Sequence, residues 1–354
     1  MRLLNCVILL LLCAALASCG ANDSGSVSTS VNTTSEEITS TAVTLAKTEV
    51  EVNSEETDEA TESQQETLPA ETVNSGYPEF DFDTKTVTLN SGYEMPILGI
   101  GCFSLSDEEA ENSVYWALSD GYRLIDTARI YGNEEAVGRG IQRAIDEGIV
   151  TREEIFVTTK MWTSDYDDGE AAVQASLDRL GLDYIDLMIL HHSQPENDVQ
   201  AYQAMEKAVG EGKLRSIGIS NYYEPEDFDR LVNATSIKPA LLQNETHPYH
   251  QSKEMQSHIA QYGTVLESWF PLGGRGNTQT LFDDPTIFSI AAAHGKTSAQ
   301  VILRWHLQAG NIAIPSSSNP DHIQENCEIF DFELSADEMA QLTAIDKNER
   351  FADY

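Results

Sequence analysis

Short apolar stretches alternate along this chain with longer stretches in which apolar residues recur every three or four positions. The short stretches are nearly continuously apolar, which is typical of strands buried on both faces of a parallel sheet. The longer stretches have the period of helices with one buried face, as at Val114, Ala117 and Leu118. We predict strands near residues 98–101, 123–126, 155–159, 185–190, 216–219, 240–244, 264–268 and 312–314.

Eight strands that alternate with helices predict a (β/α)8 barrel, the TIM-barrel architecture of the α/β class. About 270 residues are available from residue 80 onward, which suits one large domain better than two small ones. Residues 84–89 have a different pattern, because polar and apolar side chains alternate there with a period of two. The turn-forming residues 90–92 and a second extended stretch over 93–97 follow, so this region is predicted to be a β-hairpin.

The N-terminal residues have the pattern of an export signal. A basic start is followed by a mostly apolar run over 3–12 and by small residues up to Ser18. Cys19 then resembles the modified cysteine of a bacterial lipobox, which implies a palmitate-bearing lipoprotein after removal of signal peptide 1–18. A transmembrane anchor is the alternative, but the apolar run is short compared with the roughly 20 residues that a membrane span needs.

Residues 19–79 are rich in Ser, Thr, Glu and Asn and lack a sustained apolar period. Such a segment cannot bury enough apolar surface to offset its ordering entropy, so we predict a disordered tether between Cys19 and a barrel over 80–354. The whole chain has a formal net charge of −37. This charge argues against nucleic acid and anionic lipid surfaces as partners.

Five cysteines are present, and three of them, Cys6, Cys13 and Cys19, belong to the predicted export region. The other two, Cys102 and Cys327, show no zinc-binding or disulfide spacing, and we predict no metal site. One bridge between them is compatible with their number, but we expect two thiols.

Three neighbouring strand candidates end in ionisable side chains. The second strand ends at Asp126, with Tyr131 five residues later. The third apolar stretch ends in Lys160, and the fourth ends in His191. A phenol has a pKa of about 10 and is a poor proton donor near neutral pH unless a cation stabilises the phenolate. Because the C-terminal ends of barrel strands meet on one face, the pattern indicates an active site.

Each of these residues alone has a simpler interpretation. Tyr131 would usually be a half-buried amphipathic side chain, and Asp126 with Lys160 would be a structural ion pair. The occurrence of all four at successive strand ends favours the functional interpretation.

In sequence order, these residues and several short motifs resemble the aldo-keto reductase family, in particular its diketogluconate-reductase-like bacterial branch. The resemblance covers about residues 84–351. It rests on the segments 95–101, 126–135, 158–160, 218–221, 243–245, 271–273, 314–315 and 325–326. It implies a (β/α)8 barrel whose N-terminal end is capped by the predicted hairpin.

The resemblance also implies NAD(P)H-dependent reduction of an aldehyde or ketone to an alcohol. Tyr131 would give a proton to the carbonyl oxygen, and Lys160 would lower the pKa of the phenol. Asp126 would keep Lys160 charged and oriented, and His191 would polarise the carbonyl by a hydrogen bond. Trp162 matches a substrate-pocket tryptophan of the family, with simple packing as an equal alternative.

The cofactor is not expected on a Rossmann motif, because no Gly-x-Gly-x-x-Gly follows a predicted strand. The resemblance implies that nicotinamide nucleotide binds on the barrel itself. Ser220, Asn221 and Gln243 would hold the carboxamide. Trp269 would stack on the nicotinamide, in the place where the family usually has Tyr.

A Gly-rich loop that begins with Leu272 and Gly273 would cover the pyrophosphate of the cofactor. Arg275 in this loop would pair with the pyrophosphate, or it is a flexible surface side chain. Cys102 stands where the family often has Thr.

The adenine end departs from the family pattern. Ser316 and Ser317 stand near the expected 2′-phosphate site, with Ser316 in place of a family Lys and His322 in place of an Arg. The loss of charge-assisted contacts predicts NADP as cofactor with a weakened preference and with NAD also accepted. Glu325 and Asn326 match the positions that contact the adenine edge.

Two functions from different classes are compatible with these patterns. The first is an NAD(P)H-dependent reductase of small aldehydes, ketones or sugar-derived carbonyl compounds. The second is a non-catalytic lipoprotein that binds a cofactor or another ligand on the same fold. In both cases we expect a monomer that is exposed outside the cytoplasm and reaches the bacterial cell membrane only through its lipid anchor.

Overall fold

The computed structural model describes residues 77–352, so the predicted signal peptide, the predicted lipidation site Cys19 and nearly all of the predicted tether lie outside the described residues. Tyr77, within the predicted tether, is packed against the barrel. Its hydroxyl donates to the carbonyl of Gly310 at 2.9 Å and accepts the backbone N–H of Leu266 at 2.8 Å. No helix within residues 77–352 is both long and apolar enough to cross a membrane.

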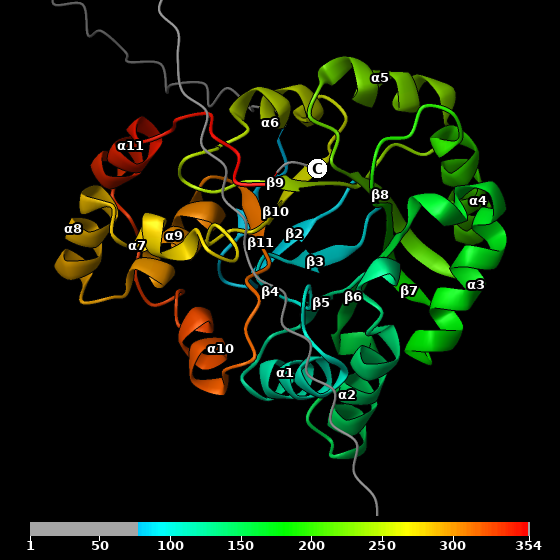
Figure 1. Ribbon diagram of the computed structural model, residues 1–354, viewed down its shortest axis with the longest axis horizontal. Helices are drawn as coiled ribbons and strands as arrows, with labels where there is room; N and C mark the ends of the chain where they lie inside the picture. The colour runs from blue at the N-terminus through cyan, green and yellow to red at the C-terminus, as the bar shows by residue number, and fades with distance from the viewer. Residues whose placement is uncertain (1–76, 353–354) are drawn as a thin grey trace, which may run out of the picture. The chain divides into compact units, whose positions relative to one another are not determined.

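Eight parallel strands form the predicted barrel at the centre of the molecule (Figure 1). Each strand pairs with its neighbours in chain order, and a bridge between Leu98 and Ala313 brings the first and last strands together. The strands are β4 (Gly99–Gly101), β5 (Leu124–Asp126), β6 (Phe156–Met161), β7 (Ile185–Leu190), β8 (Leu214–Ser220), β9 (Leu241–Glu245), β10 (Val265–Trp269) and β11 (Asn311–Ala313).

The helices form an outer layer around these strands (Figure 1). They bury one face against the sheet, as Val114, Ala117 and Leu118 do in the first helix. The helices are α1 (Asp107–Ser119), α2 (Glu134–Asp146), α3 (Gly169–Leu180), α4 (Asp198–Gly210), α5 (Pro225–Ala234), α6 (Lys253–Ala260), α7 (Thr278–Phe282), α8 (Pro285–His294), α9 (Ser298–Gln308), α10 (Pro320–Cys327) and α11 (Ala336–Ala344). The predicted TIM-barrel fold is therefore confirmed.

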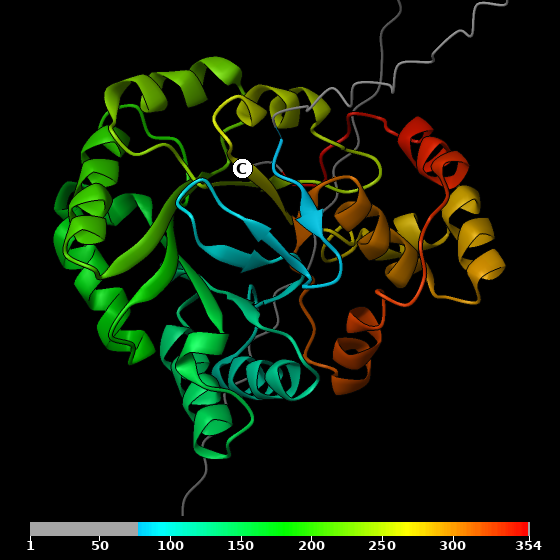
Figure 2. The same ribbon diagram turned by 180° about the vertical axis from the view of Figure 1, so that it is seen from behind.

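A small antiparallel sheet closes the N-terminal end of the barrel (Figure 2). It contains the predicted hairpin, β2 (Thr86–Thr88) with β3 (Glu94–Pro96), and a short strand β1 (Phe80–Asp81) that the sequence did not indicate. Asn90 in the hairpin turn donates to the carbonyl of Pro239, just before β9, at 2.9 Å. This sheet therefore leaves the opposite end of the barrel, which contains the C-terminal ends of the strands, free to form a site.

The strand ends differ from the prediction by one or two residues, and one difference concerns the site. Strand β6 continues through Lys160 to Met161, because Lys160 pairs with Ile189 and Met161 with Leu190 of β7. Lys160, which we predicted at the end of its strand, is a buried strand residue whose backbone is fixed by the sheet.

Candidate active site

A cavity of about 660 Å³ opens at the C-terminal ends of the strands. Its lining comes from residues far apart in the sequence, between β4 and α10. The predicted site residues that line it are Asp126, Tyr131, Trp162, His191, Ser220, Asn221, Gln243, Trp269, Leu272, Arg275, Ser316, Ser317, His322, Glu325 and Asn326. Two predicted residues are not part of the lining: Lys160, which lies behind it, and Gly273, which is followed by the lining residue Gly274.

An ion pair between Lys160 and Asp126 lies in the barrel interior, and its Asp126 side lines the cavity. The ammonium is fully buried and lies 2.5 Å from Oδ1 of Asp126, and it also donates to the carbonyl of Thr127 at 2.9 Å. Burial is the largest single effect and disfavours the ammonium, but the charge and hydrogen bond of Asp126, together with the charges of Tyr131 and Glu267, outweigh it and raise the pKa of Lys160. The pair therefore keeps a positive charge inside the barrel at neutral pH.

Tyr131 lies directly next to this charge. It ends a 3-10 turn over Arg129–Tyr131, and the left-handed Gly132 (φ +73°) ends the turn. The ring centre of Tyr131 is 4.9 Å from Nζ of Lys160. Burial raises the pKa of Tyr131 to about 12, although the charge of Lys160 lowers it in part. Lys160 therefore acts in the expected direction, but the net pKa is higher than that of a free phenol, because burial removes the water that would solvate a phenolate.

His191 follows β7 and is 8 % exposed. Its ring stacks on His192 with an interplanar angle of 6° and meets the edges of Trp162 and Tyr131 at centroid distances of 5.0 and 5.8 Å. Burial lowers the pKa of His191 to about 2, with smaller contributions from the charges of Lys160 and His192. The imidazole is therefore neutral at physiological pH and has one N–H to donate.

Large apolar side chains form the cavity wall around Tyr131 and His191. Phe103 and Ile130 are 40 % and 46 % exposed, and Trp162 and Phe270 also line the cavity. Trp162 packs on His191 and lines the cavity, and its role toward a substrate stays a prediction. Cys102 is fully buried as a free thiol and is not part of the lining.

Polar side chains also line the cavity. The side-chain oxygen of Asn221 accepts hydrogen bonds from the indole N–H of Trp269 at 3.2 Å and from the hydroxyl of Tyr223 at 3.1 Å. Its amide nitrogen donates to the carbonyl of His191 at 2.9 Å, so these contacts hold Asn221 in a left-handed conformation (φ +62°). Ser220 donates to the carbonyl of Gln243 at 2.8 Å.

The far end of the cavity lies between the loop after β10 and the start of α10. Arg275 extends from this loop and donates to the carbonyl of Ser104 at 3.0 Å, which makes a link across the cavity. Ser316 and His322 are exposed there. Arg275 is the only Lys or Arg side chain among the described residues that line the cavity.

Glu267 is the main residue of this site that sequence reasoning missed. It is fully buried on β10, and its Oε2 accepts from Nε2 of Gln243 at 2.7 Å, while the same nitrogen donates to Oδ2 of Asp126 at 2.9 Å. Burial, with a smaller contribution from the charge of Asp126, raises the pKa of Glu267 to about 8. The sequence signal that could have revealed Glu267 is an acidic residue within an otherwise apolar predicted strand.

This chain is similar to a family model and to several known proteins. The model of the family described as "Aldo/keto reductase family" matches residues 97–347. Morphine 6-dehydrogenase of Pseudomonas putida is 44% identical over 279 residues, which cover 75% of this chain and 92% of that protein. NAD(P)H-dependent D-xylose reductase I,II of Candida tropicalis is 37% identical over 306 residues, which cover 76% of this chain and 94% of that protein.

Solved structures agree with these matches. A crystal structure of a Bombyx mori aldo-keto reductase in complex with NADP has a TM-score of 0.71 and 37% sequence identity, and it covers 76% of this chain and 94% of its own. An aldo/keto reductase from Brucella melitensis has a TM-score of 0.69 and 42% identity, with 74% of this chain and 97% of its own covered.

The raised pKa of Glu267 predicts a pH-dependent cost to stability. Unfolded glutamate ionises near pH 4.5, whereas folded Glu267 keeps its proton up to about pH 8, so the folded state loses stability as the pH rises between these values. Glu267→Gln removes this loss. In urea denaturation, the stability of E267Q relative to the unaltered chain should therefore increase by about 3–4 kcal/mol from pH 5 to pH 8.

The matched control is Glu226→Gln on the exposed surface of α5, which should change stability equally at both pH values. Parallel stability curves for E267Q and the unaltered chain would show that Glu267 is ionised in the fold at neutral pH.

Proposed function

The chain belongs to the aldo/keto reductase family of NAD(P)H-dependent oxidoreductases, and from this premise we propose that it reduces an aldehyde or ketone with Tyr131 as the proton donor. One observation carries the assignment of residues. A buried Lys160–Asp126 pair lies next to the only described tyrosine that lines the cavity, and His191 lies on the same wall.

The cavity fits a nicotinamide nucleotide in size and in chemistry. Its volume of about 660 Å³ is within the range of cofactor sites. Amide and hydroxyl groups of Ser220, Asn221 and Gln243 gather at one end, with the aromatic surface of Trp269 beside them. When bound, the reduced nucleotide supplies a hydride to the carbonyl carbon.

Proton transfer is the task of Tyr131. Because its pKa is about 12, the phenol stays protonated at neutral pH and can give its proton to a carbonyl oxygen that becomes an alkoxide, which is a stronger base than phenolate. Lys160 then stabilises the phenolate that remains, and Asp126 keeps Lys160 charged and in place. Neutral His191 donates a hydrogen bond to the same oxygen and polarises the carbonyl.

The wall around Tyr131 favours carbonyl compounds with an apolar portion. Phe103, Ile130, Trp162 and Phe270 offer aromatic and aliphatic surface. The relatives named for morphine and D-xylose show that the family accepts both polycyclic and sugar-derived compounds. Membership of the diketogluconate-reductase-like branch remains a prediction.

We infer that the chain binds both NADP and NAD. Hydroxyl groups of Ser316 and Ser317 and the imidazole of His322 line the far end of the cavity, where a 2′-phosphate would lie. Such neutral groups bind phosphate less strongly than Lys or Arg does. Arg275 adds one positive charge from the loop after β10, and Glu325 and Asn326 face the adenine end.

We also propose that the chain is an exported lipoprotein that acts as a monomer. Export and lipidation rest on the residue pattern before Cys19. A mature chain that retains residues 1–18, or that carries no lipid on Cys19, would contradict the proposal. The alternative function, a non-catalytic lipoprotein, finds no support in the family relationship, because the named relatives include reductases and a dehydrogenase.

Tyr131→Phe removes the proposed proton donor but keeps the ring. We expect kcat to fall by about 100- to 10,000-fold, the usual contribution of a general acid, with the nucleotide Kd unchanged. The measurement is turnover of an aromatic aldehyde with NADPH, together with fluorescence titration of the nucleotide. Tyr93→Phe is the control, because Tyr93 is 43 % exposed in the hairpin at the other end of the barrel. Equal turnover by Y131F and the unaltered chain would refute the role.

Ser316→Lys places an ammonium beside the proposed 2′-phosphate site. We expect the Kd for NADPH to fall about tenfold, as for one charge-assisted contact, and the Kd for NADH to stay the same. Ser257→Lys on the exposed surface of α6 adds the same charge elsewhere and should change neither Kd. If S316K changes both affinities equally, Ser316 does not lie near the 2′-position.

A further inference from the structure

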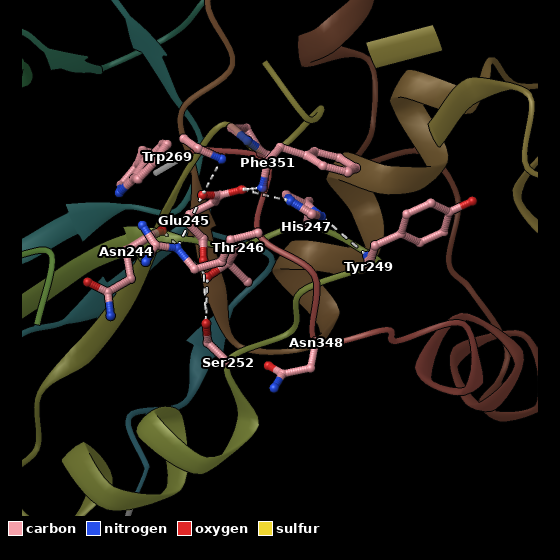
Figure 3. Close-up of polar contacts among 12 residues, drawn as sticks. Asn244, Glu245, Thr246, His247, Tyr249, Ser252, Trp269, Asn348 and Phe351 are labelled. Atoms are coloured by element: carbon pink, nitrogen blue, oxygen red, sulfur yellow. Dashed lines mark hydrogen bonds and ion pairs between the residues drawn. The ribbon is translucent and has the colours of Figure 1, made fainter. Parts of the chain in front are cut away.

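A second buried polar cluster lies where β9 ends, beside the proposed nicotinamide site (Figure 3). Its centre is the carboxylate of Glu245, which is fully buried. This carboxylate accepts the backbone N–H groups of Phe351 at 2.5 Å and Ala352 at 3.2 Å, and it lies 3.1 Å from Nε2 of His247. Nε of Arg350 lies 3.5 Å away. A single side chain of the barrel thus holds three consecutive residues of the C-terminal segment.

Further contacts fix the same segment, residues 347–352, which we call the tail. The backbone N–H groups of Lys347 and Glu349 both donate to the carbonyl of Tyr249 at 3.0 Å. The ring of Phe351 stacks on His247 with a centroid distance of 4.3 Å and an interplanar angle of 14°. Burial alone would raise the pKa of Glu245, but hydrogen bonds from His247, Phe351 and Ala352 outweigh this effect and lower the pKa. The Glu245 carboxylate that holds the tail is therefore charged.

The tail is connected to the proposed carboxamide-binding residue through Tyr223. The guanidinium of Arg350 lies 3.8 Å from the ring centre of Tyr223. The hydroxyl of Tyr223 accepts the backbone N–H of Glu245 at 3.1 Å and donates to Oδ1 of Asn221 at 3.1 Å. Because Asn221 has a left-handed backbone, which is unfavourable for a non-glycine residue, its conformation depends on such contacts.

A second connection leads to the loop after β10. A Cβ atom at Gly273 would lie 3.3 Å from Cε2 of Phe351, so the ring of Phe351 packs closely against this loop. Gly273 has φ +86° and adjoins Leu272 and Gly274, which line the cavity. The tail therefore contacts both the Asn221 side and the loop side of the proposed cofactor site.

We propose that Glu245 is a positioning residue for the cofactor. Its carboxylate holds the tail, and the tail holds Tyr223 against Asn221 and supports the loop at Gly273. The inference rests on the proposed function, because it assumes that Asn221 and this loop contact the nucleotide. It predicts a reciprocal coupling: an ordered tail strengthens nucleotide binding, and bound nucleotide protects the tail to the same extent.

The test uses the full chain and two independent readouts. The first is the Kd for NADPH by fluorescence titration. The second is the rate at which trypsin cleaves after Arg350, followed by mass spectrometry with and without saturating NADPH. Glu245→Gln keeps the size of the side chain but removes its charge and one acceptor oxygen. We expect E245Q to raise the Kd about tenfold and to speed cleavage about tenfold, while kcat at saturating NADPH stays near that of the unaltered chain.

Asp186→Asn is the matched control. Asp186 is also a buried carboxylate that accepts a backbone N–H, from Val157 at 2.9 Å, and pairs with Arg152 and Arg215, but it lies on β7 away from the cavity. D186N should lower the melting temperature without changing the Kd or the cleavage rate after Arg350. Tyr223→Phe should raise the Kd while leaving the tail as resistant to trypsin as before. It removes the hydrogen bonds of the hydroxyl to Asn221 and to the backbone N–H of Glu245, but it leaves the Glu245 carboxylate and its contacts with the tail in place.

Two results would overturn the inference. If E245Q lowers the melting temperature as D186N does but binds NADPH as the unaltered chain does, Glu245 has only a structural role. If NADPH does not slow cleavage of the unaltered chain although it binds, the tail and the cofactor site are not coupled. An unaltered chain that binds no nucleotide at all would instead refute the proposed function, and with it this inference.

Discussion

The buried ion pair between Lys160 and Asp126 is the interaction on which the proposed chemistry depends. Two charges in a barrel interior are stable only when each is closely compensated, and here the ammonium has a carboxylate at 2.5 Å and a carbonyl at 2.9 Å. The amide of Gln243 satisfies the other oxygen of Asp126. The pair thereby keeps a fixed positive charge beside Tyr131, where a phenolate would form.

The fold could be predicted from the sequence because its strands are short, apolar and regularly spaced, and the strand-end residues Asp126, Tyr131 and His191 followed from the same pattern. The short strand β1 and the continuation of β6 to Met161 depend on pairing with neighbouring strands, which no local pattern encodes. The pKa of Tyr131 also could not be predicted, since the extent of burial that outweighs Lys160 is a property of the assembled site.

The contacts that sequence reasoning missed are those between residues far apart in the chain. Glu267 meets Gln243 across neighbouring strands, and Glu245 meets Phe351 over a separation of 106 residues. In the barrel these two acids have opposite environments. Glu267 has a single hydrogen-bond donor and a raised pKa, whereas Glu245 has several donors and a lowered one. Glu267 is therefore suited to remain neutral in the barrel interior. Glu245 is suited to hold the C-terminal tail as a charged carboxylate beside the proposed cofactor site.

The most direct test of the central claim is the rate of hydride transfer in a single turnover of Lys160→Met with bound NADPH and an aromatic aldehyde. Titration of NADPH first establishes that the variant is folded and binds the nucleotide. The account predicts a rate at least about 100-fold below that of the unaltered chain, because the phenolate left after proton transfer loses its counter-charge. A rate equal to that of the unaltered chain would contradict it.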